Sequence, residues 1–261
     1  MPVATLRLPV ERPFDLRLCL FGHGWIALAP HHFDEANATF ATVLLLDELA
    51  VDATLRQTTK DTLTLRLTSE RALTAAQKQL AKRQIVHMLR LDDDLAAFHT
   101  MCRREPRLAW AARRGAGRLL RSASVFEDLM KLLFTTNTTW SGTEAMTKNL
   151  VAAAGRAAPS GARAFPSAAA CVRDVAFYRD VVRTGYRAEA AVRLATAFAD
   201  GTLHDDLFLH EPSKDALWQR LVGLRGFGPY AAGQAMRLLG HYEHLALDSW
   251  CREIGRASCR E

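Results

Sequence analysis

The stretch that decides the fold is Leu221-Val-Gly-Leu-Arg-Gly-Phe-Gly-Pro-Tyr-Ala-Ala-Gly-Gln234, close to the end of a chain of 261 residues. Glycine recurs through this stretch, and apolar residues at helical spacing flank it on both sides. Pro229 suits the first position of a helix, where its missing N–H costs nothing. We expect Gly226 and Gly228 to take positive φ values and to let another backbone approach closely. The stretch therefore predicts two short helices joined by a tight hairpin.

This predicted hairpin joins a helix over residues 217–224 to a helix over about residues 230–239. The N–H groups of its loop and of the first turn of the second helix would point outward together, which makes an anion site. A phosphate of a nucleic-acid duplex is a natural ligand for such a site. The bare pattern LxGxG is also typical of a plain structural turn between packed helices, and that interpretation stays open.

An acidic residue, Asp248, lies in an apolar run soon after the second helix. One interpretation is a helix N-cap, since Ser249 and Trp250 follow it and a capping carboxylate contributes about 1 kcal/mol. The dipole of such a helix also keeps the carboxylate ionised. A reaction that develops positive charge requires an ionised carboxylate, so Asp248 is also a candidate catalytic residue.

The rest of the chain divides into a strand-rich part and a helical part. Residues 14 to 69 have strand character, and Leu63, Leu65 and Leu67 alternate with polar residues. From about residue 72 onward, apolar residues recur at helical spacing, and prolines and glycines separate the segments. Strands first and helices afterwards indicate an α+β fold. We expect a small antiparallel β sub-domain over residues 1–72 and a mostly α-helical domain over residues 73–252.

Composition limits the class of protein. The net charge of +6 and the pI near 9.3 are compatible with a polyanion partner but do not require one. The five cysteines are scattered and include no CxxC pair, which argues against a disulfide framework and fits a reducing cytosol. Neither a signal peptide nor a run of about 18 apolar residues is present, so we expect a cytoplasmic protein with no membrane partner. No metal site is predicted.

At the hairpin and Asp248, the chain resembles the helix-hairpin-helix (HhH-GPD) DNA glycosylase superfamily, which is marked by an LxGxG hairpin followed by an essential aspartate. Other segments resemble this family in the same order along the chain: Leu89 to Leu95 with Phe98, Gly117 to Ser122, Val125 to Trp140, Phe165 to Ser167, and Thr184 to Ala188. The resemblance covers most of the chain. It points to the branch that contains 3-methyladenine DNA glycosylase II and 8-oxoguanine DNA glycosylase.

The resemblance implies which residues act. The hairpin would grip the DNA backbone through Leu224, Arg225, Gly226, Phe227, Gly228, Pro229 and Tyr230. Asp248 would be catalytic, because its carboxylate would stabilise the oxocarbenium-like sugar and help to align or deprotonate the attacking water. Bifunctional relatives carry a lysine where this chain has Tyr230, and a tyrosine cannot form the Schiff base that a lysine amine forms. We therefore expect a monofunctional DNA glycosylase of base excision repair.

Four further residues are candidates by the same resemblance. Asn137 would fill the gap left by the flipped nucleotide or contact the orphaned base; the alternative is an ordinary helix C-cap or turn asparagine. Trp140 would stack in the base pocket, although a tryptophan in a helical protein is more often part of the core. Tyr186 and Arg187 would contact the pocket or the DNA backbone, and the alternative for both is a solvated surface.

The resemblance also implies partners and cofactors. The partner is double-stranded DNA that contains a damaged base, bound by a monomer in the bacterial cytoplasm, at the nucleoid. No cofactor is expected: Cys251 and Cys259 do not match the spacing of an iron–sulfur cluster, and only a monovalent cation at the hairpin fits the family. Tyr230 favours an alkylated purine, whereas Gly117 to Ser122 and the Thr-Thr-Asn loop favour oxidised guanine. Two alternatives stay open: a non-catalytic helix-hairpin-helix DNA-binding protein, and a bifunctional oxidised-purine glycosylase/AP lyase.

The chain ends soon after Asp248, where relatives continue through further helices. Residues 253–261, Glu-Ile-Gly-Arg-Ala-Ser-Cys-Arg-Glu, match one reading frame of a widely used sequencing-adapter sequence. We therefore expect the glycosylase domain to be incomplete at its C-terminus and residues 253–261 to be a non-native tail.

Overall fold

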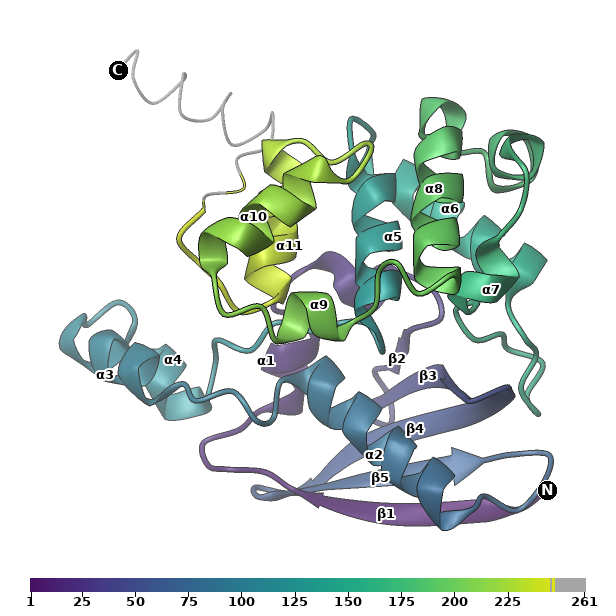
Figure 1. The fold of residues 1–261 in the computed structure, drawn as a ribbon. Helices are drawn as coiled ribbons and strands as arrows, with labels where there is room; N and C mark the ends of the chain where they lie inside the picture. Colours follow the sequence, from purple (N-terminus) through teal and green to yellow (C-terminus); the bar gives the residue numbers. More distant parts are fainter. Residues whose placement is uncertain (245, 247–261) are drawn as a thin grey trace. The chain divides into compact units, whose positions relative to one another are not determined.

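The computed structural model describes residues 1–244 and 246, and Figure 1 shows its helices and strands. The chain forms two compact units: one contains residues 1–124 and 147–170, and the other contains residues 125–146 and the residues from 171 onward. The boundary predicted after residue 72 falls inside the first unit. Within the described part of the chain, no helix is long and apolar enough to cross a membrane.

The first unit is built on a five-stranded antiparallel sheet with the strand order β1-β5-β4-β3-β2. Its strands are β1 (Val3–Pro9), β2 (His32–Asp34), β3 (Thr39–Leu46), β4 (Leu49–Thr59) and β5 (Thr62–Thr68). Its helices are α1 (Leu16–Leu20), a 3-10 helix at Gly24–Ala27, α2 (Ala75–Leu89), α3 (Ala96–Arg104) and α4 (Ala109–Arg114). The predicted α+β class and antiparallel sheet are confirmed.

The leucines of β5 explain why this sheet forms. Leu63, Leu65 and Leu67 are all fully buried, as their alternation with polar residues predicts. Leu65 pairs with Leu6 of β1 on one side and with Leu55 of β4 on the other, so one face of the sheet is apolar across three strands. Each buried leucine contributes about 1.5–3 kcal/mol. Figure 1 shows α2 crossing the sheet in this unit.

Residues 3–9 form the edge strand β1, inside the β sub-domain expected over residues 1–72 but before the segment with strand character. One prediction for the N-terminal region is wrong. Residues 16–20 form helix α1, because Asp15 caps it by accepting a hydrogen bond from the Leu18 N–H at 3.0 Å. A short apolar run fits either a strand or a helix, and only the capping residue distinguishes them.

The second unit is helical. It contains α5 (Val125–Thr135), a π-helical segment at Phe177–Val182, a 3-10 helix at Gly185–Arg187, α8 (Ala188–Ala199), α9 (Asp206–Leu209), α10 (Lys214–Gly223) and α11 (Pro229–Leu238). Helices α6 (Trp140–Ala154) and α7 (Ala168–Cys171) contribute residues to both units. In Figure 1, α10 and α11 lie side by side, and α5 and α8 form a second neighbouring pair.

Helix α5 is buried from Val125 to Phe134, although it carries three charged residues there. Lys131 and Glu127 form an ion pair at 2.6 Å with side-chain exposures of 0% and 5%. The first N–H groups of the helix are satisfied by Asp205, whose carboxylate accepts from the N–H of Val125 at 3.1 Å and from that of Phe126 at 3.4 Å. Burial raises the pKa of Asp205. Polar partners therefore offset the cost of burying this helix on all sides.

Candidate nucleic-acid interface

The predicted hairpin is present between α10 and α11. Helix α10 ends at Gly223, and the turn that follows is closed by a hydrogen bond from the Phe227 N–H to the Leu224 carbonyl at 3.0 Å. Pro229 is the first residue of α11, as its chemistry predicts. Phe227 is buried and anchors the loop, whereas Arg225, Gly226, Gly228 and Pro229 are exposed. The loop therefore presents backbone to solvent and is held by one aromatic side chain.

Gly226 is required at its position for two reasons. Its φ is +85°, in the left-handed region that favours glycine. A methyl group on its Cα would lie 2.7 Å from Leu133 Cδ1 and 3.2 Å from Ala190 Cβ. The elbow of the hairpin therefore packs directly against α5 and α8, and a side chain at this position would require Leu133 to shift.

The prediction for Gly228 is wrong, because its φ is −94° and its backbone is extended. The reason is its place at the N-cap of α11, where the residue before the first helical position is non-helical. Gly228 has no side chain with which to cap the helix, and a methyl group there would meet no atom within 4 Å. The N–H groups of the first turn of α11 have no carbonyl partner inside the helix. They are a suitable site for an anion.

Two hairpin residues differ in their surroundings. Arg225 forms an exposed ion pair with Glu189 of α8 at 2.6 Å, so its guanidinium lies beside the loop. Tyr230 is half-buried at the second position of α11. No described lysine lies on α11, the helix on which the resemblance places the Schiff-base lysine of bifunctional relatives.

The Asn137 loop joins α5 to α6. Asn137 is exposed and has a φ of +45°, the left-handed conformation that asparagine tolerates better than most residues. The loop begins with Thr136, whose hydroxyl donates to the Leu133 carbonyl at 2.8 Å. Thr143 donates from α6 to the Phe134 carbonyl at 3.1 Å. The loop is therefore a defined turn with the side chain of Asn137 at the surface.

Tyr186 and Arg187 both contact this turn. The Tyr186 hydroxyl donates to the Thr136 carbonyl at 3.3 Å, and its ring lies 4.5 Å from the Arg187 guanidinium carbon. Arg187 is 6% exposed and donates to the backbone carbonyls of Thr136, Asn137 and Thr184. The solvated-surface interpretation is wrong for Arg187, whereas Tyr186 is 67% exposed.

The packing of α5 and α8 brings these features together. Leu133, which touches Gly226, lies one helical turn before Thr136, and Ala190, which also touches Gly226, lies just after Arg187. The hairpin elbow and the Asn137 turn are thus held by the same two helices. Trp140 begins α6 beside the turn and is 42% exposed, so its ring is available for stacking and does not belong to the core.

Asp248 lies outside the described residues. The return from α11 is described as far as His244 and at Ala246. His244 stacks on Trp218 of α10 with ring centroids 4.0 Å apart, and Glu243 pairs with Lys214. A methyl group on Gly233 of α11 would lie 3.2 Å from Ala246 Cβ. The described return segment therefore runs along the two hairpin helices. The catalytic role of Asp248 and the monovalent cation at the hairpin stay predictions.

Several residues that build the interface were not identified from the sequence. Thr136 and Thr184 supply carbonyls to Arg187, Glu189 pairs with Arg225, and Asp205 caps α5. A sequence signal exists for Thr136, which lies in a run of threonines at the end of a predicted helix, and for Thr184, which begins the segment Thr184 to Ala188. Glu189 and Asp205 contact partners far away in the sequence, so no local pattern marks them.

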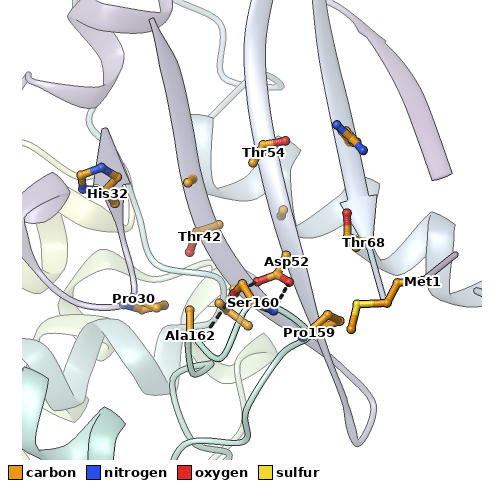
Figure 2. Close-up of a pocket in the computed structure, with 14 residues that line it drawn as sticks. Met1, Pro30, His32, Thr42, Asp52, Thr54, Thr68, Pro159, Ser160 and Ala162 are labelled. Carbon is orange, nitrogen blue, oxygen red and sulfur yellow. Dashed lines mark hydrogen bonds between the residues drawn. The ribbon is translucent and has the colours of Figure 1, made fainter. Parts of the chain in front are cut away.

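A pocket of about 560 Å³ lies in the first unit, between the sheet and the loop at residues 159–162 (Figure 2). Its sheet side includes Asp52 and Thr68, which pair across β4 and β5. Asp52 accepts hydrogen bonds from the N–H of Ser160 at 2.9 Å and from its hydroxyl at 2.5 Å. Among the described residues that line the pocket, the only carboxylate therefore holds the loop in place, and none of the described candidate site residues is among them.

Comparisons with known proteins identify the fold. No protein-family model matches the sequence, and no curated protein matches it. The structure is similar to that of a 3-methyladenine DNA-glycosylase from Archaeoglobus fulgidus, with a TM-score of 0.74 and 16% identity over 97% of this chain and 92% of that chain. It is also similar to an 8-oxoguanine glycosylase/lyase from Clostridium acetobutylicum in its apo-form, with a TM-score of 0.72 and 17% identity over 98% of this chain and 85% of that chain.

The Clostridium acetobutylicum enzyme in complex with dsDNA containing cytosine opposite to 8-oxoG gives a TM-score of 0.69 at 17% identity, over 94% of this chain and 80% of that chain. These matches extend over nearly the whole described chain, so they concern its architecture and not one motif. The α+β architecture described above, with its sheet, its helical unit and its α10–α11 hairpin, is therefore the fold of these DNA glycosylase structures.

Proposed function

We propose that this protein is a DNA glycosylase of base excision repair, which flips a damaged base out of a duplex and hydrolyses its N-glycosidic bond. The observation that carries the proposal is the contact of Gly226 with Leu133 and Ala190. This contact fixes the hairpin, for which we propose phosphate binding, against the helix that leads into the exposed Asn137 turn. The similar structures support it, since they are named as glycosylases and one is in complex with dsDNA.

Each part of the interface has a distinct task in this mechanism. The free N–H groups at the start of α11 bind a phosphate of the DNA backbone and fix the register of the protein on the duplex. Asn137 occupies the space that the flipped nucleotide leaves, or hydrogen-bonds to the orphaned base. As the base leaves, positive charge develops on the sugar. The Asp248 carboxylate stabilises this charge and aligns the water that attacks the sugar carbon.

We further propose that the enzyme is monofunctional. A lyase requires an amine that attacks the sugar and forms a Schiff base, and Tyr230 has no amine. The two lysines among the described residues of the second unit are both ion-paired, Lys131 with Glu127 and Lys214 with Glu243. Burial raises the pKa of the Cys171 thiol to about 12, so this group stays protonated and is not a nucleophile either.

An alkylated purine is the favoured substrate, because Tyr230 provides an aromatic ring where the branch of alkylpurine enzymes has one. The competing candidate is oxidised guanine, which the Thr-Thr-Asn sequence of the Asn137 loop favours. A non-catalytic DNA-binding protein is the alternative of another class, since the hairpin can bind phosphate without any reaction taking place.

One set of assays separates these functions. The protein is incubated with duplexes that carry an alkylated, an oxidised or a deaminated base, and base release is measured with and without alkali. Alkali-dependent strand breaks support the proposal, and Asp248→Asn should slow them by about a hundredfold or more. Borohydride trapping of a covalent adduct would indicate a bifunctional enzyme. Duplex binding without base release, unchanged by Asp248→Asn, would indicate a non-catalytic protein.

A further inference from the structure

Arg187 is an unusual arginine, because it is buried and its fork is directed at backbone carbonyls. Arginine is seldom buried unless its charge and its donors have partners. Here the side chain is 6% exposed and extends from the 3-10 helix at Gly185–Arg187 toward the turn that follows α5. A solvated surface arginine has neither this burial nor these hydrogen bonds, which suit a role of Arg187 in holding the turn.

The hydrogen bonds of Arg187 join two turns. Nε lies 3.0 Å from the Thr136 carbonyl and 3.2 Å from the Thr136 hydroxyl, and Nη2 lies 3.0 Å from the Asn137 carbonyl. Nη1 lies 3.1 Å from the carbonyl of Thr184, in its own turn. One rigid guanidinium therefore ties the Asn137 turn to the turn before α8.

The Thr136 and Asn137 carbonyls belong to the turn that directly follows α5, so they have no partner inside that helix. Asn137 holds a positive φ of 45°, a conformation that costs an L-residue free energy unless its surroundings fix it. The planar fork of Arg187 bonds both carbonyls at once, which fixes their positions relative to each other. The Tyr186 hydroxyl adds a further donor to the Thr136 carbonyl.

We propose that Arg187 is the positioning residue of the Asn137 turn. It holds the backbone at Thr136 and Asn137, so that the Asn137 side chain is presented to the gap left by the flipped nucleotide. This inference rests on the proposed function. The sequence-based expectation for Arg187, a contact with the pocket or the DNA backbone, is the alternative that the experiments below test.

The central variant is Arg187→Lys, which keeps the positive charge but loses the planar fork. Its matched control is Arg220→Lys, since Arg220 also spans two partners, the Leu207 carbonyl at 2.6 Å and Glu211 at 2.9 Å, away from the Asn137 turn. In single-turnover assays on the preferred duplex, Arg187→Lys should lower the rate of base release about tenfold, whereas the Kd for the duplex changes less than about threefold. Arg220→Lys should leave both values within about twofold.

A double-mutant cycle tests whether Arg187 acts through Asn137. In an Asn137→Ala background, Arg187→Lys should lower the rate by less than about twofold further, because the side chain that it positions is gone. A phosphate contact would behave otherwise: in Arg187→Ala, which removes the charge, duplex binding would weaken and the slope of log Kd against log salt would fall by about one. That salt result, or effects that multiply in the cycle, would overturn the proposal.

A measurement on the free protein keeps this inference separate from the proposed function. Amide hydrogen exchange of residues 136–139 should accelerate about tenfold in Arg187→Lys, whereas exchange in α10 stays unchanged. Unchanged exchange in the turn would refute the positioning role, whatever the activity. If the wild-type protein releases no base from any duplex, the proposed function fails, and the exchange result still decides whether Arg187 holds the turn.

Discussion

Gly226→Ala should damage both the stability and the DNA binding of this protein. The new methyl group would lie 2.7 Å from Leu133 Cδ1, closer than any packed core tolerates, and 3.2 Å from Ala190 Cβ. Forcing extra carbon into such a contact costs about 1–3 kcal/mol. The left-handed φ of +85° adds about 1–2 kcal/mol for an L-residue. The free energy of unfolding should therefore fall by roughly 2–5 kcal/mol, a large share of a typical domain's stability.

Urea unfolding followed by tryptophan fluorescence measures this loss, and Gly228→Ala is its matched control. Gly228 has a φ of −94°, and a methyl group there meets no atom within 4 Å. We expect Gly228→Ala to lower the free energy of unfolding by no more than about 1 kcal/mol, because alanine is a poorer N-cap than glycine. It should nevertheless weaken duplex binding, because the methyl group would lie beside the N–H groups proposed to hold a phosphate.

The double variant Gly226→Ala/Leu133→Ala shows whether the contact with α5 is the cause. Truncation of Leu133 removes the Cδ1 atom that the new methyl group meets. The double variant should therefore be more stable than the sum of the two single effects predicts, with a coupling of about 1 kcal/mol or more. Additive effects, or equal losses in Gly226→Ala and Gly228→Ala, would refute the conclusion that Gly226 is needed for its close contact and its φ.

Three further predictions follow from the second unit. Lys131→Met should lower the free energy of unfolding by about 3–5 kcal/mol, because it removes the ammonium that pairs with the buried Glu127 carboxylate, whereas Lys131→Met/Glu127→Leu should restore most of the loss in the same urea titration. Burial raises the pKa of Asp205, so the folded state binds a proton at this carboxyl group more tightly than the unfolded state does. The contribution of Asp205 to stability therefore falls as the pH rises from about 4 through the raised pKa. Asp205→Asn keeps an acceptor for the N–H groups of α5 but cannot titrate. The stability of this variant relative to the wild type should therefore increase between about pH 4 and pH 7. A constant difference across this range would contradict a raised pKa for Asp205. Tyr230→Lys should place an amine on the first turn of α11 and permit borohydride trapping on an abasic duplex, whereas the wild type should give no adduct.

Local chemistry accounts for the features that could be predicted. Pro229 begins a helix because it has no N–H to lose, and Gly226 takes a positive φ because it has no Cβ. Leu63, Leu65 and Leu67 are buried together because strand residues two apart share a face. In each case, the determinant lies within a few residues along the chain.

The same local reasoning failed where two conformations fit one short pattern. The apolar run at Leu16–Leu20 suits a strand as well as a helix, and the cap provided by Asp15 decides for the helix. Gly228 could have taken a positive φ, but its place before the first turn of α11 makes its backbone extended. In both cases the two conformations differ little in free energy, and the structure of the neighbouring residues decides between them.

The sequence by itself determined the α+β class, the hairpin and the candidate residues Asn137 and Tyr230, since each depends on residue type and short-range spacing. Only the tertiary structure decided that Gly226 packs against Leu133 and Ala190, and that Arg187 is buried against the carbonyls of Thr136 and Asn137. The physical reason is sequence separation: Arg187 and Thr136 are 51 positions apart, so no local pattern relates them. Their contact exists only because α5 and α8 pack together.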